Sequence, residues 1–216
     1  MDITILYFTG NTKDSYFAEK IRQNILRYKG DLPIVSVSQK SLDFGQNICV
    51  GEHDPCYLNI DRQVQIGLKI IKTQYILTAN DDFLYPPEYF SFRPQEPGKC
   101  YRYDNVWVCY KDGPFYFKGY SDGAQLIDRE LWLEAKNNIL KGRKMWAKSG
   151  EHTSKEIHLK YLIRTDKNYT WSGRPVVDFK TGKDVSPKTE TIKKVAPQDS
   201  LLFWGKVDDL RKMVLR

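Results

Sequence analysis

The 216-residue sequence lacks the long apolar run, about 18 residues, that a membrane-spanning helix requires. Its first residues, MDITILYFTGN, include the acidic Asp2 and lack the basic residues that open a secretory signal peptide. We therefore interpret this segment as a first strand and expect a cytoplasmic protein. Apolar residues make up 41% of the chain, which is enough for a hydrophobic core and argues against general disorder.

Cysteine is scarce, with four residues and no CxxC pair. Cys49, His53 and Cys56 are too loosely spaced for a typical zinc site, and a disulfide framework is not expected at this length. We expect reduced, partly buried thiols.

The sequence also lacks internal repeats, low-complexity tracts and a complete glycine-rich phosphate loop. The segment Lys180-Thr181-Gly182-Lys183 does not match a Walker A loop. We interpret it as a turn whose lysines could meet an anionic group. The missing phosphate loop counts against a nucleotidyltransferase, although this function stays open as an alternative.

Strand and helix patterns alternate in the first half of the chain. Apolar runs predict strands, and apolar residues at helical spacing predict amphipathic helices. The predicted strands are Ile3–Phe8, Ile34–Val37 and Tyr75–Ala79, and the predicted helices are Asp14–Tyr28 and Asn59–Lys72. This order predicts βαβ units in a mostly parallel sheet, whose ligands bind beyond the carboxyl ends of the strands.

The second half is less regular. Aromatic runs predict a hairpin, and later patterns predict helices and a strand between glycine- and proline-rich loops. The predicted hairpin strands are Cys100–Tyr110 and Phe115–Tyr120, the helices are Asp128–Leu140, Ser154–Ile163 and Val207–Leu215, and the strand lies within Thr165–Ser186.

Asn80-Asp81-Asp82 directly follows the predicted strand Tyr75–Ala79 and precedes a proline pair. Carboxylates at the end of a strand can hold a divalent cation against a diphosphate, because Mg²⁺ and similar ions prefer oxygen ligands. The alternative is an ordinary surface loop.

This stretch resembles the DxD-type motif of GT-A-fold, family-2-like nucleotide-sugar glycosyltransferases. Further segments resemble that family in order and spacing over about residues 3–165. They are Ile3–Asn11, Gly51–Leu68, Tyr103–Val108 and Ser121–Arg129. The resemblance implies a GT-A-like, Rossmann-related α/β fold that transfers a sugar from a nucleotide-diphosphate sugar to an acceptor hydroxyl, with inversion. We expect a catalytic core over 1–165, divided into a nucleotide-sugar half (1–90) and an acceptor half (91–165). A basic extension (166–216) packs on the same domain.

The resemblance also implies roles for particular residues. It places the donor against the loop after the first strand, Arg62 and the triplet. It also places a Mn²⁺ or Mg²⁺ ion on Asp82, assisted by Asn80. The implied donor-binding residues are Thr9, Gly10, Asn11, Arg62, Asn80 and Asp81. Asn80 departs from the pattern, because the family has a carboxylate at this position and asparagine brings no charge.

An inverting transfer needs a general base to take the proton of the acceptor hydroxyl. By resemblance the candidates are Glu156 and Glu151, with Asp122 as a third. Acidic residues also favour the start of a helix, which is the alternative explanation for both glutamates.

The net charge is +7, and the basic excess lies in residues 136–216. Such an excess suits a polyanionic partner such as modified DNA, or a lipid-linked or polysaccharide acceptor at an anionic membrane surface. The alternative is solvated helix faces. A different class of function is also open, namely a catalytically inactive GT-A-like protein that binds nucleic acid.

Overall fold

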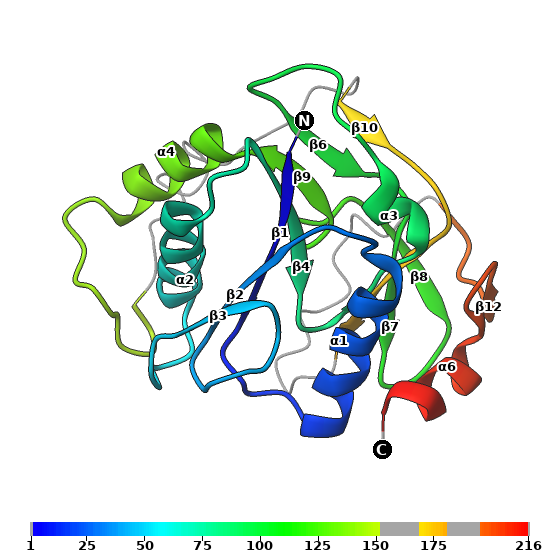
Figure 1. Ribbon diagram of the computed structural model, residues 1–216. Helices are drawn as coiled ribbons and strands as arrows, with labels where there is room; N and C mark the ends of the chain where they lie inside the picture. The colour runs from blue at the N-terminus through cyan, green and yellow to red at the C-terminus, as the bar shows by residue number, and fades with distance from the viewer. Residues whose placement is uncertain (1, 152–168, 181–194, 216) are drawn as a thin grey trace.

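A computed structural model describes residues 2–151, 169–180 and 195–215. Two sheets carry most of its strands (Figure 1). The larger sheet has seven strands in the order β10-β6-β9-β4-β1-β2-β3. These strands are β1 (Ile3–Thr9), β2 (Ile34–Ser38), β3 (Gln46–Cys49), β4 (Tyr75–Asn80), β6 (Cys100–Tyr103), β9 (Gln125–Asp128) and β10 (Thr170–Trp171).

Most neighbours in the larger sheet are parallel, and only β9 runs antiparallel to both of its neighbours. The predicted α/β class with a mostly parallel, helix-flanked sheet is therefore confirmed. The smaller sheet has the order β5-β11-β7-β8. Its strands are β5 (Phe83–Leu84), β7 (Val106–Tyr110), β8 (Phe115–Gly119) and β11 (Val176–Lys180).

Helices cover both faces of the larger sheet because side chains alternate along each strand. On β1, Leu6 faces a cluster that includes Leu68 and Trp132, while Ile5 and Tyr7 face the opposite cluster with Ile21. Helices α2 and α4 lie side by side on the first face, and α1 lies on the second (Figure 1). The helices are α1 (Ser15–Tyr28), α2 (Tyr57–Ile70), α3 (Pro87–Ser91), α4 (Arg129–Leu140) and α6 (Val207–Val214).

Local chemistry explains the helix ends. Asp14 caps α1 by accepting from the backbone N–H groups of Tyr16 and Phe17, as its sequence position predicts. Gly30 follows the helix with φ +58°, a conformation that glycine adopts without steric cost. The chain can therefore reverse there and enter β2.

The predicted strand Cys100–Tyr110 is wrong as a single element. It breaks at Asp104 and Asn105, so that β6 joins the larger sheet while β7 pairs with β8 in the smaller one. The aromatic run hides this break, because both halves are buried and apolar. Strands β3 and β9 were not predicted; β3 is short and β9 lies within the segment Ser121–Arg129.

The C-terminal part belongs to the same packed structure. It supplies β10 to the larger sheet, β11 to the smaller one, and the hairpin of β12 (Ser200–Leu201) and β13 (Gly205–Lys206) before α6. The predicted helix Ser154–Ile163 and the boundary at residue 165 lie outside the described residues. None of the described helices combines the length and the apolar character needed to cross a membrane.

Candidate active site

The triplet Asn80-Asp81-Asp82 lies where the carboxyl ends of β1 and β4 meet. The two strands are parallel neighbours, with Phe8 opposite Asn80, so the triplet is beside the loop that follows β1. Thr9 donates its hydroxyl to Asp81 over 2.5 Å. The sequence prediction that these two segments share one edge of the sheet is confirmed.

Asp82 is largely buried between charges of both signs. Burial raises its pKa to about 7, with the neighbouring carboxylates of Asp81 and Asp178 acting in the same direction. Lys13 opposes the shift, and its Nζ lies 3.5 Å from the Asp82 carboxylate. Burial also raises the pKa of Asp81, against the hydrogen bond from Thr9. The pair is thus a costly arrangement that the fold maintains with specific partners.

Asn80 is held by its backbone and leaves its side-chain oxygen unused. Its N–H donates to the Tyr85 hydroxyl (2.9 Å), which in turn donates to the carbonyl of Gly123 (2.6 Å). The Asn80 Oδ1 atom is buried and has no hydrogen-bond partner among the described residues. An orphaned buried acceptor at this place fits a cation or a hydroxyl donor of a ligand.

The loop after β1 is fixed to the end of β2. Asn11 adopts φ +53° and its Oδ1 accepts from the backbone N–H groups of Gln39 and Lys40. This side chain therefore shapes the loop. Gln63 on α2 completes the support by donating to the carbonyls of Thr9 and Val37.

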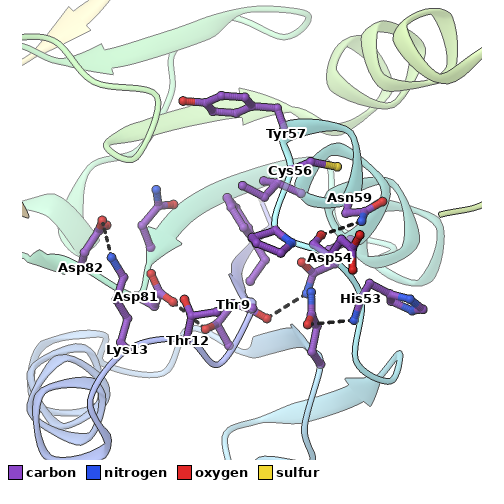
Figure 2. Close-up of a pocket in the computed structure, with 17 residues that line it drawn as sticks. Thr9, Thr12, Lys13, His53, Asp54, Cys56, Tyr57, Asn59, Asp81 and Asp82 are labelled. Atoms are coloured by element: carbon purple, nitrogen blue, oxygen red, sulfur yellow. Dashed lines mark hydrogen bonds and ion pairs between the residues drawn. The ribbon is translucent and has the colours of Figure 1, made fainter. Parts of the chain in front are cut away.

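A cavity of about 410 Å³ opens between this loop, α2 and the triplet. Figure 2 shows Asp81, Asp82 and Lys13 at one end and His53 and Asp54 at the other. The lining residues are Phe8, Thr9, Gly10, Thr12, Lys13, Gln39, His53, Asp54, Pro55, Cys56, Tyr57, Asn59, Ile60, Gln63, Asn80, Asp81 and Asp82. One end with mixed hydrogen-bonding groups and another with carboxylates and a lysine suit a nucleotide and its phosphates.

A second cavity of about 290 Å³ lies on the other side of the triplet and shares Asn80 and Asp82 with the first. The smaller sheet and the segment 120–123 form most of its wall. Its lining residues are Asn80, Asp82, Phe83, Arg102, Lys118, Tyr120, Ser121, Asp122, Gly123, Asp178 and Lys180.

The predicted donor-binding residues divide between these positions. Thr9, Gly10, Asn80 and Asp81 line the first cavity, and Asn11 lies behind its wall. Arg62 does not line it; its guanidinium donates to the carbonyls of Lys144 and Met145, tying α2 to the segment 141–150.

The three candidate bases are placed differently. Asp122 lines the second cavity and is paired with Arg102 at 2.7 Å. Glu151 is exposed, lines neither cavity, and accepts from the backbone N–H of Lys148. Glu156 lies outside the described residues.

Sequence reasoning missed several side chains of the site. Lys13, Gln39 and Gln63 were not singled out, and neither were Lys118 and Asp178. Lys13 could have been found as the lone cation between the first strand and its helix. Lys118 and Asp178 come from a sheet whose strand order cannot be inferred from local patterns.

The residues present fit a divalent cation that the substrate helps to hold. In the described part of the chain, no three His, Cys, Asp or Glu side chains are grouped as a ready-made metal site. Mg²⁺ is commonly bound by only one or two carboxylates, with phosphate oxygens and water completing the shell. Asp82 and the unpartnered oxygen of Asn80 can supply that protein share.

Comparison with known proteins gives matches among solved structures only. No protein-family model matches the chain, and neither does any curated protein. A glycosyltransferase involved in the glycosylation of the major capsid of PBCV-1 aligns over 80% of this chain and 81% of its own, at 12% identity and a TM-score of 0.44.

Two further solved structures align as well. The inositol-1-phosphate CTP transferase from T. maritima aligns over 91% of this chain and 98% of its own, at 12% identity and a TM-score of 0.48. The bifunctional IspDF from Campylobacter jejuni aligns over 80% of this chain at 8% identity and a TM-score of 0.44, and the alignment spans only 49% of IspDF. All three alignments have TM-scores below 0.5, so the reaction is inferred from the site itself.

Proposed function

We propose that the chain is a glycosyltransferase that moves a sugar from a nucleotide-diphosphate sugar to an acceptor hydroxyl. The observation that carries the proposal is the pair of cavities that meet at Asn80 and Asp82. Transfer requires donor and acceptor to meet at one point, and holding both there removes much of the entropic barrier. The larger cavity would hold the donor and the smaller one the acceptor.

The chain's own residues have separable roles in this scheme. Thr9 keeps the Asp81 carboxylate in place, and Lys13 brings a positive charge to the end of the donor cavity. Asp82 and Asn80 would hold a Mn²⁺ or Mg²⁺ ion. When bound, the ion neutralises charge on the departing nucleoside diphosphate.

Inverting transfer needs a base on the acceptor side, and Asp122 is the candidate that lines the second cavity. Arg102 Nη2 lies 2.7 Å from this carboxylate and fixes its position at the cavity wall. Glu151 and Glu156 remain proposals by resemblance.

A hydrolysis assay tests the proposal. Purified protein is incubated with a panel of nucleotide sugars, with and without Mn²⁺ or Mg²⁺, and release of nucleoside diphosphate is measured. Asp82→Ala should lower release about 100-fold or more, on the scale of losing a charge-stabilising group. Asp31→Ala is the matched control, because Asp31 is exposed and precedes β2 at the opposite edge of the sheet.

The same assay separates other reactions. Release of pyrophosphate from a nucleoside triphosphate would indicate nucleotidyl transfer. No reaction with any nucleotide sugar, together with tight duplex binding, would favour the inactive nucleic-acid-binding protein. A polyanionic acceptor such as DNA predicts binding that weakens steeply with added salt.

A further inference from the structure

Asp178 is a fully buried carboxylate that the proposed reaction does not use. It lies on β11, where it is paired in register with Phe83 of β5, the strand that follows the triplet. The backbone N–H of its neighbour Phe179 donates to the Asp82 carbonyl over 2.8 Å. Burying a lone carboxylate is costly, so a charge at this position requires partners.

Two lysines supply them. Lys118 Nζ lies 2.9 Å from one carboxylate oxygen of Asp178, and Lys180 Nζ lies 2.8 Å from the other. Lys118 also donates to the Ser121 hydroxyl over 3.1 Å. Both lysine side chains are about one-third exposed and line the second cavity. An ammonium group has three donor hydrogens, so among the described residues both lysines keep donors for a ligand.

Among the described residues, the other charged groups that line this cavity are Arg102, Asp122 and Asp82. Arg102 and Asp122 pair with each other at 2.7 Å. Asp82 is paired with Lys13 from the donor side. At about 290 Å³ the cavity has room for a small chemical group and excludes a helix or a duplex.

We propose that Lys118 and Lys180, positioned by Asp178, bind an oxyanion group of the acceptor. The ligand class is an acceptor sugar that carries a phosphate or a carboxylate, because ammonium groups are donors only and pair with oxyanions. The identification of this anion as part of the acceptor rests on the proposed function. The anion site itself rests on the lysines and the cavity.

Direct binding measurements test the site. Calorimetric titration uses three probes, namely a hexose 6-phosphate, a hexuronic acid and the neutral hexose. One or both of the anionic sugars should bind at least about ten-fold more tightly than the neutral one, and the stronger of the two identifies the source of the oxyanion. Equal binding of all three would overturn the inference.

Variants locate the site. Lys118→Met and Lys180→Met should each weaken binding of the anionic sugar about ten-fold or more, whereas Lys206→Met, on an exposed residue of β13, should leave it unchanged. Lys118→Arg keeps the charge and should restore most of the affinity. If Lys13→Met loses binding of the anionic sugar while Lys118→Met binds it normally, the anion lies in the donor cavity and the assignment is refuted.

Thermal unfolding of each variant checks folding. Each single variant is expected to fold, because Asp178 keeps the other lysine as a partner. A lysine variant that folds and binds the anionic sugar like the wild type overturns the inference. These titrations need no donor and no transfer. A negative hydrolysis assay would therefore refute the proposed reaction without refuting the anion site. A negative titration would refute the anion site without refuting the proposed reaction.

Discussion

At the scale of single residues, Thr9 makes a contact on which the geometry of the larger cavity depends. Its hydroxyl donates to Asp81 and accepts from the backbone N–H of Asn11, so it joins the triplet to the first loop. Asp81 is largely buried, and a buried carboxylate without its donor loses a charge-assisted hydrogen bond.

We expect Thr9→Val to lower the free energy of unfolding by about 1.5–3 kcal/mol, the usual range for a hydrogen bond to a charged group. Chemical denaturation measures the change. Thr9→Ser keeps the hydroxyl and should lose clearly less. A larger loss for Thr9→Ser than for Thr9→Val would mean that the methyl packing, and not the hydrogen bond, matters.

Burial also distinguishes the four cysteines, and we expect their thiols to differ in reactivity. Burial raises the pKa of Cys100 to about 12 and that of Cys109 to about 11, whereas Cys49 is exposed. A raised thiol pKa means less of the reactive thiolate at any lower pH.

At pH 8, therefore, a disulfide reagent such as Ellman's reagent should react fast with Cys49, and Cys100 and Cys109 should stay protected even at pH 9. Unfolding in denaturant should expose all four thiols. The check is Cys49→Ser, which should remove the fast phase. A fast phase that survives this substitution would contradict the described burial.

At the scale of elements, α2 is a brace for the segment 141–150. Asn59 is almost fully buried, donates to the carbonyls of Asp54 and Ala147, and accepts from the Ala147 N–H at 2.8 Å. Asp54 in turn accepts from the backbone N–H of Ser149. The wall of the larger cavity is thus joined to the segment that leads to Glu151.

Asn59→Ala should lower the free energy of unfolding by about 1–3 kcal/mol, because the Ala147 N–H is then buried without a partner. The same variant should weaken binding of nucleoside diphosphates, since Asn59 lines the cavity. Lys69→Ala, on an exposed residue of the same helix, should change neither quantity. Thermal unfolding with and without nucleotide measures both.

The smaller sheet is the element that local patterns predict least. Its central strand β11 comes from residues 176–180, while its neighbours come from residues 83–84 and 106–110. Such pairings depend on tertiary packing, and no turn connects them. Lys118 and Asp178 therefore could not be placed in a site from the sequence.

At the scale of the whole molecule, the C-terminal helix is part of the main core. Leu210 is 2% exposed and belongs to the same apolar cluster as Phe17 of α1, and Tyr16 donates to the carbonyl of Met213. The segment 195–215 thus closes one side of the molecule (Figure 1).

Leu210→Ala should lower the free energy of unfolding by about 2–5 kcal/mol, the usual cost of emptying a buried leucine site. Met213→Ala on the same helix should cost within about 0.5 kcal/mol, because that side chain is half exposed. Denaturant unfolding of both variants gives the comparison. Similar small effects for both would mean that the helix is not part of the cooperative unit.

The sequence was sufficient for most elements of the first half of the chain, although the short β3 was missed. Periodic apolar patterns over 3–28 and 57–80 identify elements whose order alone brings the triplet to the carboxyl edge of the sheet. The pattern could not show that Asn11 is used to shape a loop or that Arg62 bonds to the segment 141–150, because both depend on contacts distant in sequence. The resemblance likewise named a motif and left its cationic neighbours unidentified.

The shared wall between the two cavities has a consequence for engineering and for divergence. Because Asn80 and Asp82 are the only described residues that belong to both linings, changes on β8 and β11 alter one cavity without touching the loop and helix that form the other. During evolution, the ligand specificity of the second cavity could therefore change while that of the first is kept. A library restricted to positions 118 and 180, one on each strand, would test this freedom.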